Sequence, residues 1–168
     1  MAAREAMPLK RIVSGGQTGV DRGALDAALA AGFPCGGWCP AGRTAEDGAI
    51  DARYPVVELA NAGYRERTIQ NVADSDATLI VYFADLHGGT ELTLLACVRR
   101  GKPYKLVDAA EIVAERAAAV ALTFVARHGA STLNVAGPRE SHAPGAHAYA
   151  FEAVSRLIAA TASGPQSA

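Results

Sequence analysis

The stretch ATLIVYF, residues 77–83, decides the fold, because it is apolar at nearly every position. A strand with one face in water alternates apolar and polar residues, whereas a strand covered on both faces reads as a continuous apolar run. The stretch therefore predicts a central strand of a mostly parallel sheet. Five other short runs have the composition of strands: 10–14, 34–39, 56–59, 104–107 and 132–135.

Longer helical patterns alternate with these strands, at 20–31, 64–74, 90–100, 109–128 and 148–162. Gly32, Gly101 and Gly129 stand where three of the helices would end. Asp108 and Glu111 have the spacing of a capping box, which predicts a helix that starts at about 109. Such alternation is typical of an α/β fold with helices on both faces of the sheet.

The composition is that of an ordinary globular domain. A chain of 168 residues can form one well-packed core, so we expect one domain over 8–162 with frayed ends at 1–7 and 163–168. The formal net charge of −1 gives no field that would attract a nucleic-acid backbone, so no nucleic acid is expected as a partner. No apolar run approaches the roughly 18 residues of a membrane span, and three cysteines fit a reducing compartment. We therefore expect a cytoplasmic protein without membrane contact.

Three loops at the expected carboxyl ends of strands have an unusual composition, and ligands bind at this edge of a parallel sheet. They read GGQTGVDR at 15–22, GGTELT at 88–93 and AGPRES at 136–141. In the first loop, Gly15 and Gly16 permit close approach of a ligand. The amides of Thr18 to Val20 are expected to point outward at a helix start, where an anion is stabilised by about 0.3–1 kcal/mol. An ordinary tight turn before a capped helix is the alternative.

Charged residues accompany the glycines in these loops. Asp21 would repel a phosphate unless Arg22, a metal ion or a ligand hydroxyl lies between them. Glu91 has three candidate roles: accepting hydrogen bonds from the amino–imino edge of a heterocycle, acting as general acid or base, or completing the helix start. Arg139 either holds phosphate or carboxylate with its planar fork or is a solvated loop residue.

Histidine and cysteine pairs do not indicate a metal site. His142 and His147 match no helical ligand pair and have no obvious third ligand. Cys35 and Cys39 differ in spacing from a zinc ribbon, which also needs a second pair. We therefore expect no metal centre.

Taken together and in this order, several motifs resemble one family. They are GGQTGVDR (15–22), GGWCPAGRTAEDG (36–48), the segment 67–81, GGTELT (88–93), GKP (101–103) and LNVAGPRES (133–141). They resemble the proteins described as molybdenum carriers, the circularly permuted branch of the SLOG-type Rossmann superfamily, over nearly the whole chain. The resemblance implies a single Rossmann-like three-layer domain, a homo-oligomer such as a dimer or tetramer, and in some members the binding and protection of molybdenum cofactor.

The resemblance and the loop composition together predict a set of residues that bind an anionic ligand. They are Gly15, Gly16, Gln17, Thr18, Gly19, Asp21, Arg22, Gly88, Gly89, Thr90, Glu91 and Arg139. In this hypothesis residues 15–22 form the phosphate loop.

Three functions are open at this point. The favoured one is a small-molecule binding protein, a carrier or storage protein for molybdenum cofactor, which is a phosphorylated pterin held as cargo with no catalytic cofactor. The second is a nucleotide-directed N-glycosidase, similar to the phosphoribohydrolases of the superfamily, with Glu91 as the catalytic residue. The third is a nucleotide or oligonucleotide sensor that binds a nucleotide-like anion and signals through a partner. The carrier is favoured because GGTEL lacks the longer glycine spacing of the hydrolases, and because binding alone needs no base near a reacting atom.

Overall fold

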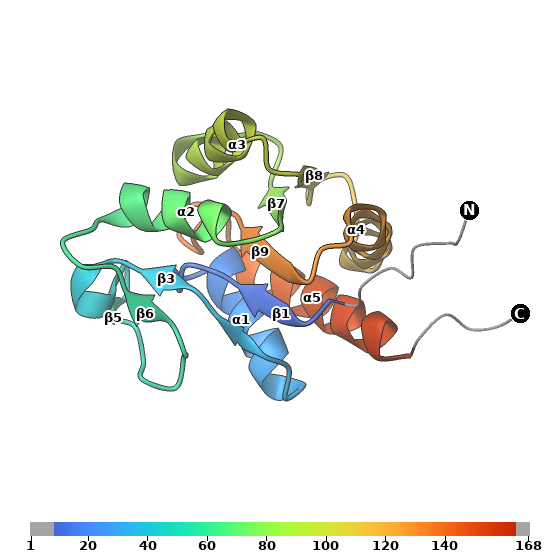
Figure 1. The fold of residues 1–168 in the computed structure, drawn as a ribbon, viewed down its shortest axis with the longest axis horizontal. Helices are drawn as coiled ribbons and strands as arrows, with labels where there is room; N and C mark the ends of the chain where they lie inside the picture. The colour runs from blue at the N-terminus through green and yellow to red at the C-terminus, as the bar shows by residue number, and fades with distance from the viewer. Residues whose placement is uncertain (1–8, 164–168) are drawn as a thin grey trace, which may run out of the picture.

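The computed structural model describes residues 9–163, which form five α-helices around a central five-stranded sheet (Figure 1). The strands of this sheet are β1 (Arg11–Val13), β2 (Cys35–Gly36), β7 (Ala77–Tyr82), β8 (Tyr104–Asp108) and β9 (Thr132–Ala136). The helices are α1 (Val20–Ala30), α2 (Tyr64–Ala73), α3 (Gly88–Arg100), α4 (Ala114–His128) and α5 (Ala146–Ala162). The ends predicted to be frayed, 1–7 and 163–168, lie outside the described residues, apart from Ser163 after α5.

The central sheet is entirely parallel, with the strand order β2-β1-β9-β7-β8. The last strand in the chain, β9, therefore lies in the middle of the sheet. If β9 is counted first, the order becomes 3-2-1-4-5, which is that of a Rossmann sheet in a circularly permuted chain. The order reverses between β9 and β7, and a ligand crevice is expected at the carboxyl ends of these two strands.

Helices cover both faces of the sheet, which confirms the predicted three layers. The helices α1, α4 and α5 pack on one face, and α2 and α3 pack on the other (Figure 1). Small residues allow α1 and α5 to approach closely, since a Cβ added to Gly23 would lie 2.4 Å from the carbonyl oxygen of His147. No helix within residues 9–163 has the length and apolar character needed to cross a membrane.

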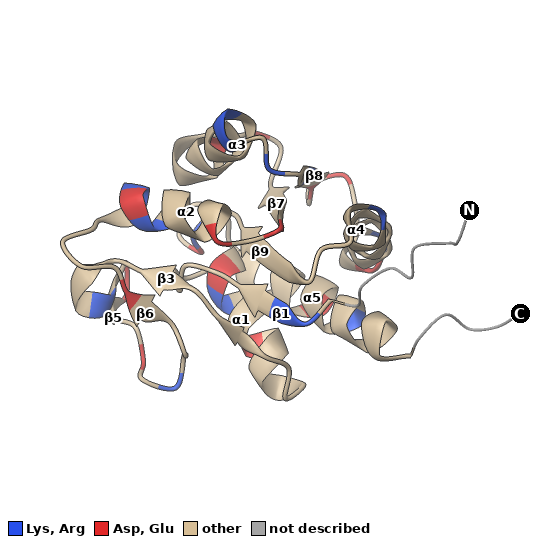
Figure 2. Cartoon of the chain, viewed as in Figure 1, with Lys and Arg blue, Asp and Glu red and all other residues tan. Residues whose placement is uncertain are grey.

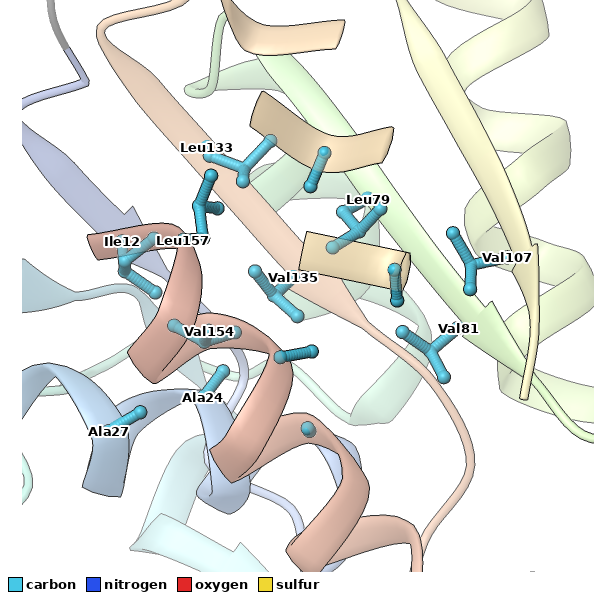
Figure 3. Close-up of a cluster of buried hydrophobic side chains, with 14 of the residues drawn as sticks. Ile12, Ala24, Ala27, Leu79, Val81, Val107, Leu133, Val135, Val154 and Leu157 are labelled. Carbon is cyan, nitrogen blue, oxygen red and sulfur yellow. The ribbon is translucent and has the colours of Figure 1, made fainter. Parts of the chain in front are cut away.

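The central strand β7 is buried on both faces, as its continuous apolar sequence predicts. Leu79 and Val81 join the larger core with α1, α4 and α5, which Figure 3 shows around the labelled side chains of Val135 and Val154. Ile80 points to the opposite face and packs in a smaller cluster with residues of α2 and α3. Burial on both faces fixes the position of β7, so the loop that follows it has a rigid base.

The prediction of one continuous strand over 34–39 is wrong, because the structure has two short strands there. Gly37 separates them, with φ at 131° and so little space that a Cβ would lie 2.1 Å from the carbonyl oxygen of Ser14. After this break the chain leaves the central sheet, and β3 (Trp38–Cys39) pairs with β6 (Val57–Glu58) in a separate two-stranded sheet. Between them lie a short 3-10 helix (Ala41–Arg43) and the hairpin of β4 (Thr44–Ala45) and β5 (Gly48–Ala49), which the sequence did not predict.

The predicted capping box at Asp108 is also wrong. The helix α4 begins at Ala114, five residues after the predicted start. The carboxylate of Asp108 instead accepts hydrogen bonds from the amides of Ala84 and Ala110, each at 2.9 Å. Its role is therefore to hold the loop after β7, which borders the crevice between β7 and β9. By contrast, Gly101 and Gly129 do end helices in the left-handed conformation, as expected.

Candidate functional site

A cavity of about 320 Å³ lies at the carboxyl ends of β7 and β9, where the strand order reverses. We call it the cleft. Its walls come from the loop after β1, from α2, from the segment after β7 that enters α3, and from the segment after β9. Residues of the predicted site that line it are Gln17, Asp21, Gly88, Gly89, Thr90 and Arg139. Residues of the predicted site outside its lining are Gly15, Gly16, Thr18, Gly19, Arg22 and Glu91.

The glycines of the first loop make room for other parts of the protein. A Cβ on Gly15 would lie 2.1 Å from Nη1 of Arg67, so this glycine leaves space for a guanidinium. Gly19 has φ at 78°, and a Cβ there would lie 2.4 Å from the carbonyl oxygen of Pro138. The first loop is therefore shaped by contact with α2 and with the segment after β9.

The prediction that amides of the first loop point outward is wrong at two positions. The amide of Thr18 donates to Oε1 of Gln17 at 3.0 Å, and that of Val20 donates to the carbonyl oxygen of Pro138 at 3.2 Å. Arg22 also turns away from the cleft, because its guanidinium forms an ion pair with Asp47. These groups already have protein partners, so they are not free to hold the phosphate that residues 15–22 were predicted to bind.

A buried ion pair joins the first loop to α2 in the wall of the cleft. Asp21 is only 3% exposed, and its carboxylate lies 3.5 Å from Nη1 of Arg67. Burial raises the pKa of Asp21, and the positive charge of Arg67 partly opposes that effect. Within residues 9–163, Nε of Arg67 and Nε2 of Gln17 are buried without an acceptor. Buried side-chain donors without an acceptor are unusual. Binding of a ligand that shifts these two side chains would be one way to give them acceptors.

The second loop presents the open end of α3 to the cleft. Gly88, Gly89 and Thr90 line the cleft, and the first hydrogen bond of the helix runs from the amide of Glu91 to His87 at 3.4 Å. No side chain caps this helix start, so the three preceding amides have no acceptor within the described part of the chain. A helix start of this kind favours an anion, because its free amides and the helix dipole both point at the ligand.

Two arginines and a tyrosine form a second wall of the cleft, which is cationic and aromatic. The Tyr64 ring lies 5.4 Å from the guanidinium carbon of Arg139 and 5.9 Å from that of Arg67. The rings of His87 and His142 also line the cleft, with their centroids 6.3 Å apart. The cleft thus combines cationic groups, free amides and aromatic surface.

Sequence reasoning gave no role to Arg67, Tyr64 or His87. Arg67 and Tyr64 belong to α2, which follows the separate β3–β6 sheet, so the rule about loops at strand ends did not select them. Arg67 does fall in the segment 67–81 that carries the family resemblance, and that was the only available signal. His87 immediately precedes the glycines of the second loop and could have been found from that position.

The hairpin of β4 and β5 fastens the first loop to the segment after β9. At its tip, Glu46 accepts hydrogen bonds from the hydroxyl of Thr18 and from the amide of Ser141, the latter at 3.2 Å. Its carboxylate lies 4.0 Å from Nη1 of Arg139. Hydrogen bonds from Ser141 and Thr18 lower the pKa of Glu46. The hairpin therefore positions Arg139 at the mouth of the cleft.

The fold and the cleft are those of a circularly permuted Rossmann-like domain, and comparisons with known proteins give the same class. The family model for the circularly permutated YpsA SLOG family matches residues 12–158. The chain belongs to this family. No curated protein matches it. Among solved structures it is similar to the crystal structure of "Putative molybdenum carrier protein" from Syntrophus aciditrophicus SB, with a TM-score of 0.87 and 38% sequence identity. The match covers 90% of this chain and 96% of that chain.

Proposed function

We propose that this protein binds a small phosphorylated heterocycle in the cleft, and that the ligand is a phosphorylated pterin such as molybdenum cofactor, held as cargo. One observation carries the proposal: the open start of α3 and the guanidinium of Arg139 line a single cleft. A phosphate is stabilised by free amides at a helix start and by the planar fork of an arginine. The similar Syntrophus protein is described as a molybdenum carrier, which supports molybdenum as part of the cargo.

The aromatic and acidic residues of the cleft suit the heterocycle. Tyr64 and Phe83 provide flat apolar surface. Asp85 also lines the cleft, and a carboxylate can accept hydrogen bonds from the amino–imino edge of a pterin. Four charge-assisted hydrogen bonds at the upper end of about 1.5–3 kcal/mol each, less an association cost of at least ~4 kcal/mol, reach the ~8 kcal/mol of a micromolar complex. The available groups are therefore sufficient for a carrier.

The position of Glu91 supports binding without turnover. Its side chain is exposed and does not line the cleft, so it is poorly placed to act on a ligand there. Asp21 does line the cleft, but its carboxylate is buried against Arg67. A base needs hydrogen-bond access to the reacting atom, and neither Glu91 nor Asp21 has it, while the third carboxylate, Asp85, is assigned here to the pterin edge. The N-glycosidase alternative therefore has less support than the carrier.

The test is a calorimetric titration with a phosphorylated pterin, compared with AMP and with inorganic phosphate. Arg139→Ala is expected to weaken pterin binding about 10- to 100-fold, because a hydrogen bond to a charged group contributes about 1.5–3 kcal/mol. Arg22→Ala is the matched control, since Arg22 pairs with Asp47 outside the cleft, and it should bind as the parent protein does. Binding of AMP alone would favour the nucleotide sensor, and release of free base from AMP would favour the enzyme.

We also propose that the protein works in the cytoplasm as a homo-oligomer, a dimer or a tetramer. Leu95 and Val98 on α3 are 42% and 57% exposed, and this apolar surface suits a contact between subunits. Light scattering on the purified protein tests the proposal. A monomer at micromolar concentration would contradict it.

A further inference from the structure

The strand β8 is the open edge of the central sheet on the side away from β2. In its ladder with β7, the carbonyl of Pro103 accepts from Thr78 and the amide of Ala109 donates to Tyr82, so odd-numbered residues face β7. The amides and carbonyls of Tyr104 and Leu106 point the other way. Within residues 9–163 they have no hydrogen-bond partner. Such an edge can accept another strand.

A basic groove runs beside this edge. Its volume is about 410 Å³, and it lies between β8 and an exposed stripe of α4. Its cationic residues are Lys105, Arg116 and Arg127, and its lining also includes Val120, Phe124 and His128. In the described part of the chain, no carboxylate forms an ion pair with Lys105, Arg116 or Arg127. Figure 2 shows blue segments on α4, close to β8 at the rim of the molecule.

We propose that an extended, acidic segment of a partner protein binds here by adding a strand to β8. The open amides and carbonyls of Tyr104 and Leu106 supply main-chain hydrogen bonds, as in other cases of strand addition. Acidic side chains on the α4 side of the added strand meet Arg116 and Arg127, which gives the segment its charge preference. The groove is separate from the cleft, so the proposal does not depend on the ligand proposed above.

Charge and backbone chemistry favour this occupant over two others. A second copy of the chain, paired about a twofold axis at β8, would bring the same cations together, and like charges disfavour such an interface. A nucleic acid could satisfy the cations, but it has no peptide groups to pair with a strand edge. The formal net charge of the whole chain is −1, so the basic groove is a local feature and not a general property of the surface.

The test is fluorescence anisotropy with a labelled peptide in which Glu and Val alternate, beside the same peptide with Lys in place of Glu. The Glu peptide is expected to bind at least tenfold more tightly than the Lys peptide. The double variant Arg116→Glu/Arg127→Glu should weaken the Glu peptide about tenfold or more. The matched control is Arg53→Glu/Arg156→Glu, which changes the net charge equally at exposed arginines elsewhere and should have little effect.

A second variant tests the strand edge itself. Tyr104→Pro removes an amide that faces away from β7, and proline is tolerated at the first residue of a strand. It should weaken the Glu peptide, whereas Tyr104→Val, which keeps the amide, should not. No binding of the Glu peptide to the parent protein would overturn the proposal. Three other results would also overturn it. The first is binding of the Glu peptide that neither the charge reversal nor Tyr104→Pro changes, and the second is self-association through this edge in sedimentation. The third is an oligonucleotide that competes with the Glu peptide and binds both position-104 variants equally well.

Discussion

At the residue scale, the cleft depends on where one guanidinium lies. Arg67 is 12% exposed, passes over Gly15 and ends beside the carboxylate of Asp21. A side chain at position 15 would occupy the space of the guanidinium, so the absence of a Cβ is part of the site although Gly15 does not line it. The role of this glycine is thus the placement of Arg67, and we expect it to affect the proposed ligand only through that arginine.

Gly15→Ala should therefore displace Arg67 and weaken both the fold and ligand binding. Forcing a methyl group into a packed site costs about 1–3 kcal/mol, and we expect a loss of this size in the free energy of unfolding by urea. Gly63→Ala is the matched control, because a Cβ there would have its nearest contact at 3.4 Å, with a flexible glutamate side chain. Equal stability and equal pterin binding in the two variants would show that Gly15 does not serve this purpose.

At the element scale, α3 and the β4–β5 hairpin have different roles in the cleft. The helix α3 presents its uncapped start to the cleft, and the hairpin holds the segment that carries Arg139. Long elements such as β7 and α3 could be predicted because an apolar run or a helical period extends over many residues. The hairpin could not, since strands of two residues carry no period and are fixed by hydrogen bonds such as those of Glu46 with distant loops.

Gly89→Asp is expected to separate ligand binding from stability. A carboxylate in the first turn of α3 should stabilise the helix by about 0.3–1 kcal/mol, while repelling a phosphate at the same place. A Cβ at Gly89 would meet no atom within 4 Å, so the fold should tolerate the change. The midpoint temperature of thermal unfolding should be unchanged or slightly higher, and pterin binding should be lost. Gly89→Ala should keep binding. If the aspartate variant bound the pterin as tightly as the alanine variant, the anion would have to lie elsewhere.

Glu46→Gln tests the hairpin. The pKa of Glu46 is lowered in the folded protein, so its carboxylate stabilises the fold above its ordinary pKa of 4.5, and this contribution is lost as the pH falls through the lowered value. At neutral pH the variant should lose up to about 1 kcal/mol of unfolding free energy, because Glu46 is exposed and water screens its charge, and the difference from the parent protein should shrink in acid. Glu111→Gln, at an exposed turn, is the control. A difference that stayed constant with pH would exclude the charge of Glu46 as the cause.

At the scale of the whole molecule, the fold class followed from the sequence more completely than the site did. The alternation of strands and helices predicted the parallel sheet and its two helical layers, because both depend on local periods. The position of β9 in the middle of the sheet has no local signature, and it determines which loops meet at the cleft. For that reason Arg139 and the start of α3 lie together in the cleft, whereas Arg22, which was expected beside them, pairs with Asp47 elsewhere.

The most direct measurement is mass spectrometry of the ligand released from protein purified without oxygen, with pterin fluorescence recorded after oxidation. If the cleft holds a phosphorylated pterin, the parent protein and Arg22→Ala should yield it in near-equal amounts, and Gly89→Asp and Arg139→Ala should yield little or none. A parent protein that carries no pterin and also fails to bind an added phosphorylated pterin would contradict the account.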